Sequence, residues 1–236
     1  MEIAEYQPKN IDDFHHLFRC YRSHDGLANW FRGQSDAKWP LIPKAGRKEY
    51  YLPDNRDLGR FYDWSRNAVA YGSLPEAKIE SLSLAQHHGL ATRLLDWTIN
   101  PLVAAYFCAI ENQDVDGNIY VIKMPEQQAN DDIKFDALKE YKGVIGYMPK
   151  FISPRMLNQR ALFTIHCDAK CEIQITESYL GNGEPNLTKI LISSSLKEEI
   201  IKMLDDYGIN QVSLFPDLDG LSIYMNHKTE LMKKPT

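Results

Sequence analysis

The chain has 236 residues, a net charge of −5 and a globular composition, with 44% hydrophobic and 25% charged residues. This length can bury a substantial core within one domain, and the acidic balance gives no general attraction to nucleic acid or anionic membranes. Four cysteines without a CxxC spacing do not favour a zinc site. Neither a signal peptide nor a run of about 20 apolar residues is recognisable, so we expect a soluble, cytoplasmic protein without a membrane partner.

The first third of the chain predicts helices separated by one strand and one extended segment. Asn10 is placed to cap a helix whose first turn is acidic. Residues 30–34 predict a short strand, and the prolines of WPLIPKAGR predict an extended path after it. Helices are expected over about 57–71 and from Pro75 onward. A local basic patch could bind a phosphorylated ligand or simply face solvent; it comprises Arg32, Lys38, Lys44 and Arg47 against Asp36.

Residues 84–110, LAQHHGLATRLLDWTINPLVAAYFCAI, form the stretch around which we expect the chain to be organised. Gly89 suits the left-handed position that ends a helix, and residues 92–98 predict a strand. Asn100 followed by Pro101 predicts the cap and first residue of a new helix. Because residues 102–110 are apolar on every face, that helix should be buried along its whole length.

The second half of the chain predicts mainly strands, at 118–123, 161–166, 172–176, 189–193 and 210–215. Ser195 and Glu198 have the spacing of a capping box for a helix that reaches Tyr207, and a short helix should end the chain. Residues 125–150 are a candidate for a mobile insertion. We therefore expect one α+β domain over residues 1–236, with a mixed or antiparallel sheet and flanking helices.

Several common motifs are not found in the sequence. There is no GxxxxGK phosphate loop, GxGxxG fingerprint, GxSxG elbow or HExxH helix. The segment LFPDLDG offers paired acids for a metal-dependent nuclease, but the E-x-K that such a site needs does not follow it. Asp217 and Asp219 are therefore better explained as a helix cap and a first-turn acid.

Four groups of polar residues remain as site candidates. Arg32 ends a strand and could grip phosphate through paired hydrogen bonds, or form an ion pair with Asp36 or Asp96. Gln86 and His87 precede a tight turn and could bind a ligand or stabilise that turn. Strand alternation places Thr92, Leu94, Asp96 and Thr98 on one face, and Arg93, Leu95 and Trp97 on the other. The fourth group, Asn158-Gln159-Arg160, stands just before a predicted strand.

The blocks FRGQ, LAQHHGLATRLLDWTINPLVAAYFCA, NQRALFT and LFPDLDGL occur in the order that is typical of the FRG domain family. The chain resembles this family from about residue 30 to residue 221. The family is widespread in bacteria and phages and is linked by context to phage defence and toxins. Its layout is similar to a divergent ADP-ribosyltransferase fold.

In the ADP-ribosyltransferase superfamily an arginine or histidine on the first strand grips NAD, a second strand with Ser or Thr leads into a helix, and a later strand carries Glu or Gln. The resemblance assigns these places to Arg32, residues 92–98 and Gln159. Asp96 would stabilise the cationic ribose or orient the acceptor, and Glu172 could supply the carboxylate that Gln159 lacks. The implied NAD-binding residues are Arg32, Gly33, Gln34, Gln86, His87, Thr92, Arg93 and Thr98; Arg47 could assist, and no metal is implied.

We therefore expect an NAD-dependent ADP-ribosyltransferase or an NAD-consuming effector that modifies a macromolecular acceptor of unspecified kind. The alternative is a module that binds a nucleotide or nucleic acid without catalysis. A metal-dependent nuclease is the third hypothesis. Nothing in the sequence predicts an oligomeric state.

Overall fold

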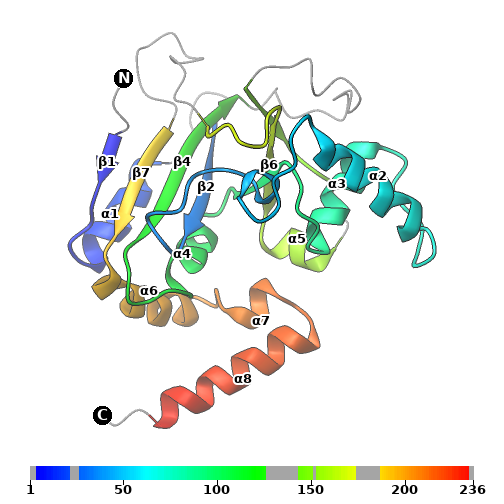
Figure 1. Cartoon of the computed structure of the whole chain (residues 1–236). Helices are drawn as coiled ribbons and strands as arrows, with labels where there is room; N and C mark the ends of the chain where they lie inside the picture. The colour runs from blue at the N-terminus through cyan, green and yellow to red at the C-terminus, as the bar shows by residue number, and fades with distance from the viewer. Residues whose placement is uncertain (1–3, 22–26, 126–142, 151–152, 174–186, 234–236) are drawn as a thin grey trace.

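A computed structural model describes residues 4–21, 27–125, 143–150, 153–173 and 187–233 (Figure 1). Most of the insertion expected at 125–150 therefore lies outside the described residues. The same holds for most of the strand expected at 172–176, since only its first two residues are described and these are not part of a strand. Within the described ranges, no helix combines the length and apolar character needed to cross a membrane.

One seven-stranded sheet forms the centre of the molecule, in the order β1-β7-β4-β2-β3-β6-β5. Every neighbouring pair is antiparallel except β1 and β7, which run parallel, so the expected α+β class with a mixed sheet is confirmed. The strands are β1 (Ala4–Tyr6), β2 (Leu27–Gln34), β3 (Leu94–Thr98), β4 (Gly117–Pro125), β5 (Val144–Tyr147), β6 (Ala161–His166) and β7 (Leu187–Ile192).

Helices cover the sheet mainly on one side (Figure 1). Helices α1 (Ile11–Cys20), α4 (Pro101–Ala109) and α6 (Ser194–Asp206) share a core with β2, β4 and β7. Helices α2 (Arg56–Ala68), α3 (Lys78–His87) and α5 (Pro154–Asn158) pack at the β6–β5 end. A third cluster joins Trp30, Trp97 and Leu162 to residues of the extended segment, notably Leu41.

Helix α4 begins as the sequence predicts, because the Asn100 side chain accepts a hydrogen bond from the Leu102 amide and Pro101 opens the first turn. It lies against β2 at Gly33, where a Cβ atom would stand only 1.9 Å from the carbonyl oxygen of Ala104. Only glycine permits this close approach of strand and helix. The expectation of burial along the whole helix is wrong in part, since Leu102, Phe107 and Ile110 are only partly buried.

The C-terminal elements correct the expectations most. Residues 210–215 do not form a strand; Asn210 and Ser213 exchange capping-box hydrogen bonds that start the short helix α7 (Gln211–Leu214). The chain then enters α8 (Leu218–Lys233), which is longer than expected. The capping box proposed at Ser195 is also wrong, because α6 is preceded by Ser193, whose side chain makes no capping bond. Strands β1 and β5 and helix α5 were not predicted.

Candidate functional site

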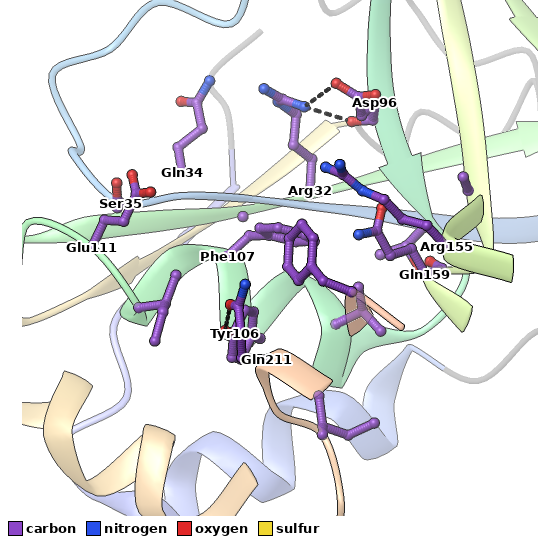
Figure 2. Close-up of a pocket in the computed structure, with 18 of the residues that line it drawn as sticks. Arg32, Gln34, Ser35, Asp96, Tyr106, Phe107, Glu111, Arg155, Gln159 and Gln211 are labelled. Carbon is purple, nitrogen blue, oxygen red and sulfur yellow. Dashed lines mark hydrogen bonds and ion pairs between the residues drawn. The ribbon is translucent and has the colours of Figure 1, made fainter. Parts of the chain in front are cut away.

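A cavity of about 990 Å³ opens where β2 and β3 separate. The two strands pair only at Phe31 and Thr98, whereas β2 pairs with β4 from Leu27 to Gln34. Beyond Phe31 the strands diverge, and residues from both edges line the space between them (Figure 2). The cavity therefore occupies a gap in the sheet, floored by α4 and bordered by α3, α5, α6 and α8.

Arg32 bridges this gap. Its Nη1 atom donates to the backbone oxygen of Asp96 at 2.7 Å and stands 3.7 Å from the carboxylate oxygen Oδ2 of the same residue. The Nε atom is buried and has no hydrogen-bond partner. Burial lowers the pKa of the guanidinium, Asp96 acts in the opposite direction, and Arg47 lowers it further. An arginine remains charged in proteins, so Arg32 presents a cation with spare donor capacity to the cavity.

The Asp96 carboxylate is held in place from two sides. Oδ1 accepts a 2.7 Å hydrogen bond from Nε2 of Gln86, which comes from α3, while Oδ2 faces Arg32. Gln86 is in turn fixed because its Oε1 accepts a hydrogen bond from the Thr92 hydroxyl. The side chain of Asp96 is nevertheless 62% exposed. Its orientation is thus fixed while it stays accessible to a ligand.

Positive charge surrounds this carboxylate on the cavity wall. Lys44 and Arg47 come from the extended segment and line the cavity. Arg155 comes from α5 and lies near Asp96 in the close-up (Figure 2). Burial lowers the pKa of Arg155, while Asp96 and Asp217 raise it. His87 has its pKa lowered by burial, then by Arg155 and His88, so its imidazole is neutral at pH 7. This half of the cavity suits a ligand with more than one negative charge.

The floor of the cavity is aromatic. Phe107 lines it and meets Phe215 edge to face, with ring centroids 6.1 Å apart. Arg155 stacks over the Phe215 ring at 4.5 Å. Below them, the Tyr106 hydroxyl donates to Oε1 of Gln211 at 2.6 Å (Figure 2). Apolar and aromatic surface beside a basic rim is the composition that a nucleotide, with one flat base and charged phosphates, requires.

Gln159 lies immediately before β6 and lines the same cavity. Its amide nitrogen Nε2 donates to the backbone oxygen of Leu214 at 3.1 Å, which ties it to α7. Its backbone oxygen accepts a hydrogen bond from the Thr98 hydroxyl at 2.7 Å. Thr98 therefore holds the turn before β6 against the end of β3, and Gln159 stands across the gap from Arg32.

The structure brings most of the expected site residues together. The residues of that set that line the cavity are Arg32, Gly33, Gln34, Gln86, His87, Asp96, Thr98 and Gln159. Thr92 and Arg93 do not line it. Thr92 is buried, and its hydroxyl donates a hydrogen bond to Gln86, which lines the cavity. Gly33 borders the cavity, but the space that its missing side chain leaves is filled by the backbone of α4.

Arg93 is the clearest correction to the expected set. It is 1% exposed, and its guanidinium forms a two-bond ion pair with Asp57, at 2.9 Å from Nε and 2.7 Å from Nη2. It donates further to the backbone oxygen of Cys167 and to the side chain of Asn55. Since its nitrogens are committed to these partners away from the cavity, Arg93 anchors α2 to the sheet and has no access to a ligand in the cavity.

Sequence reasoning missed Arg155 and Phe215. Arg155 lies on α5, and the signal for that helix was present, because Ser153 caps it and Pro154 occupies its first turn. Phe215 follows α7 and was assigned to a strand. Nothing in the local sequence indicates that these two side chains meet across the cavity, because the contact joins segments about 60 residues apart.

A smaller cavity of about 480 Å³ lies between the start of α2 and the turn after β6, lined by Asp54, Cys167 and Cys171 among others. Burial raises the pKa of the Cys167 thiol. Within the described part of the chain, no group of three or more His, Cys, Asp or Glu side chains is arranged to hold a metal ion.

Comparison with known proteins gives one match. Residues 28–117 match the family described as FRG domain, a span that runs from β2 to the first residue of β4 and contains Arg32, Gln86 and Asp96. No curated protein and no solved structure matches the chain.

Proposed function

We propose, from the match of residues 28–117 to the FRG domain family and from the geometry of the cavity, that the cavity binds NAD and that the protein cleaves its nicotinamide–ribose bond to transfer ADP-ribose. The observation that carries the proposal is the incompletely bonded Arg32 beside an oriented, accessible Asp96. An NAD-binding site needs cationic donors for a diphosphate, a flat apolar surface for a base and a group that stabilises a developing positive charge.

The residues present fit the parts of NAD. The buried Nε of Arg32 and Oε1 of Gln34 have no hydrogen-bond partner in the described structure, so both side chains have unused hydrogen-bonding capacity next to the cavity. Arg32, Arg47 and Arg155 can share the diphosphate, because guanidinium groups pair with phosphate through two parallel hydrogen bonds. Phe107 offers its ring to the adenine or nicotinamide base.

The protein contributes to this reaction by positioning NAD and by stabilising the positive charge that develops on the ribose. The bond between the ribose C1′ and the nicotinamide nitrogen breaks, and its electron pair leaves with nicotinamide, which becomes neutral. The resulting oxocarbenium-like ribose is captured by an O–H or N–H group of the acceptor, or by water. Asp96 stabilises the developing cation and takes the proton that the acceptor releases.

The arrangement of strands supports this proposal. The ADP-ribosyltransferase layout places its three key positions on an initial strand, on a second strand that leads into a helix, and at a later strand. Here Arg32 lies on β2, Asp96 lies on β3, which leads into α4, and Gln159 precedes β6. These strands are neighbours in the order β2-β3-β6, and all three residues line one cavity.

The direct test is nicotinamide release. Purified protein is incubated with NAD, with and without a cell extract as a source of acceptors, and free nicotinamide is measured by chromatography. Time-dependent release that is lost in Arg32→Ala supports the proposal. Arg66→Ala is the matched control, because Arg66 is an exposed arginine on α2 that does not line the cavity. Saturable binding of NAD without release would contradict the catalytic half of the proposal.

Such a result would favour the second candidate, a module that binds a nucleotide without turnover. One observation supports this alternative: position 159 carries an amide, and that amide is already bonded to the Leu214 oxygen. Glutamine can hold a ribose hydroxyl but supplies no negative charge.

Gln159→Glu separates the two candidates. If the rate of catalysis is limited because Asp96 is the single carboxylate beside the ribose, a second carboxylate at position 159 should raise nicotinamide release. The glutamate side chain cannot donate the hydrogen bond that Gln159 makes to the Leu214 oxygen. Gln159→Ala should lower release. Thermal melts of both variants check that α7 remains in place. An identical rate in wild type and in both variants would show that position 159 has no part in the reaction.

A further inference from the structure

Helix α8 is exposed on almost all sides. It lies below α6 and α7, apart from the sheet (Figure 1). From Leu221 to Glu230, only Tyr224 and His227 are even partly buried. The helix nevertheless carries large apolar side chains, with Leu218 80%, Leu221 44% and Met225 55% exposed. Apolar side chains concentrated on an exposed helix are typical of an interaction surface.

The two sides of α8 differ in what they face. The residues of α8 that line the cavity are Ile223, Tyr224, Asn226, His227, Lys228 and Glu230. The Tyr224 hydroxyl donates to Oδ1 of Asp205 in α6 at 3.1 Å. Leu218, Leu221 and Met225 do not line the cavity. With 100° between successive residues, these three fall on the side of the helix opposite to His227. They form a continuous outer stripe, at the three- and four-residue spacing of a helix that packs on another helix.

A stripe of this kind needs a partner. A lone helix of about 16 residues is marginally stable in water, and most helical stability in proteins comes from packing of an apolar face. From Leu221 to Glu230, the side chains that are partly buried against the body are Tyr224 and His227, and the Tyr224 hydroxyl bonds Asp205 of α6. The outer stripe contributes nothing to that packing.

We propose that the outer stripe of α8 binds α8 of a second copy of this chain, so that the protein is a dimer. The whole chain carries a charge of −5, and two copies therefore repel each other over most of their surface. Helix α8 contains two acidic and two basic residues, so its net charge is zero. Two copies of the chain can therefore make contact through α8 without the electrostatic repulsion that acts between the rest of their surfaces. A two-fold contact also needs a self-complementary patch, and the spacing of the stripe supplies one.

Charge selects the antiparallel arrangement. In that arrangement Leu221 of one copy packs on Met225 of the other, and Leu218 lies opposite Lys228 at the edge of the stripe. The Lys228 ammonium group, which in the single copy stands 5.0 Å from the centroid of the Tyr224 ring, turns toward Asp217 and Asp219 at the start of the opposite helix. A parallel pair would instead place Lys228 against Lys228, which is unfavourable. The antiparallel pair therefore buries the stripe and matches the charges.

The oligomeric state tests the proposal. Light scattering after size-exclusion chromatography should give the mass of a dimer for the wild-type chain at micromolar concentrations. Leu221→Glu and Met225→Glu should each weaken the dimer by about tenfold or more, because the new carboxylate would be buried without a partner. Both positions are exposed in the single copy, so folding should be unchanged by circular dichroism. Val69→Glu, at an exposed apolar residue after α2, is the matched control and should remain dimeric.

Disulfide trapping tests the arrangement. The background carries Cys171→Ser, because Cys171 is exposed whereas Cys108 and Cys167, the other two cysteines whose burial the structure describes, are buried. In it, the double variant Leu221→Cys/Met225→Cys should form a crosslinked dimer under mild oxidation, and Leu218→Cys alone should not. The background protein without added cysteines is the blank. A monomer at every concentration, or a dimer that both glutamate variants retain, would overturn the proposal. Crosslinking through Leu218→Cys would overturn the antiparallel pairing.

Discussion

Two arginine–aspartate pairs lie in the same domain and differ in how completely each arginine is bonded. Arg93 and Asp57 are both nearly inaccessible to solvent, with two hydrogen bonds between them and two further bonds from Arg93 to Cys167 and Asn55. Arg32 meets Asp96 more loosely, with a 3.7 Å contact between side chains, one bond to a backbone oxygen and a buried Nε without a partner.

How completely each arginine is hydrogen-bonded distinguishes an ion pair that stabilises the fold from one that can bind a ligand. A buried pair in which every guanidinium nitrogen is hydrogen-bonded is not accessible to a ligand, and removal of one member leaves a buried charge. A pair that is open on one side can still interact with a ligand in the cavity, through its charges and through the N–H groups of Arg32 that have no other partner. Three substitutions and one change of pH test whether the two pairs differ in this way, and the loss of Asp57 should have the largest effect.

Asp57→Ala should have the largest effect on stability. It leaves the Arg93 guanidinium buried without its counter-charge, which typically costs about 3–5 kcal/mol. Urea unfolding monitored by tryptophan fluorescence measures the loss. Asp63→Ala is the control, because Asp63 pairs with Arg66 on the exposed side of α2, and exposed pairs contribute about 0–1 kcal/mol. Equal losses in the two variants would mean that the buried pair is not structural.

Acidification should weaken the buried network next to Arg93. The His166 amide donates to the Arg93 backbone oxygen at 3.0 Å, and burial lowers the pKa of the His166 imidazole from 6.5 to about 4. Between these values the unfolded chain binds a proton that the folded chain does not, so stability falls as the pH drops below 6.5 and levels off near 4. A shift of this size corresponds to about 3 kcal/mol.

Unfolding free energies at a series of pH values measure this loss. In His166→Gln the contribution from this group should vanish, while carboxylate titration common to both proteins remains. The informative quantity is therefore the difference between the two pH profiles. Parallel profiles from pH 7 to pH 4 would show that His166 titrates normally in the folded protein.

Arg32→Lys should weaken ligand binding with little change in stability. An ammonium group keeps the charge but cannot form two parallel bonds to a phosphate, and loss of one charge-assisted hydrogen bond costs about 1.5–3 kcal/mol. Calorimetric titration with ADP-ribose measures the affinity. Arg66→Lys should bind as wild type does. Unchanged affinity in a folded Arg32→Lys protein would restrict Arg32 to bridging β2 and β3.

Asp96→Asn should have the smallest effect on stability, less than about 1 kcal/mol, because the carboxylate is 62% exposed and its pairing with Arg32 is loose. The amide can still accept the hydrogen bond from Gln86. Nicotinamide release should nevertheless fall, since the negative charge is gone. A large loss of stability would place Asp96 with Asp57 among the structural acids.

Local signals predicted the elements that depend on local chemistry. Asn100 and Pro101 specify the start of α4, and Gly89 adopts the left-handed conformation, with φ of 90°, that ends α3. The alternation of residues 92–98 had already separated Arg93 from Asp96; the assignment of Arg93 to the ligand came from the resemblance. In this case the pattern of the strand was the better guide.

Long-range contacts explain most of what the sequence did not reveal. The gap between β2 and β3 follows from how the strands diverge after a single paired position, and no residue type marks that divergence. Arg155 reaches the cavity because α5 precedes β6, and β6 pairs with β3. Asp57 has an ordinary first-turn position on α2, and only the folded chain brings it against Arg93.

The contact between Gly33 and α4 has a consequence for how this protein can vary. The position next to Arg32 fixes the distance between strand and helix, because even a methyl group would meet the Ala104 oxygen. Gly33, which determines the packing of β2 on α4, is therefore joined by a single peptide bond to Arg32, whose side chain lines the cavity. Substitutions at residue 33 would disrupt this packing, so they cannot change which ligand the cavity binds. Changes in ligand specificity must instead come from residues on the opposite wall of the cavity, around Arg155 and Phe215.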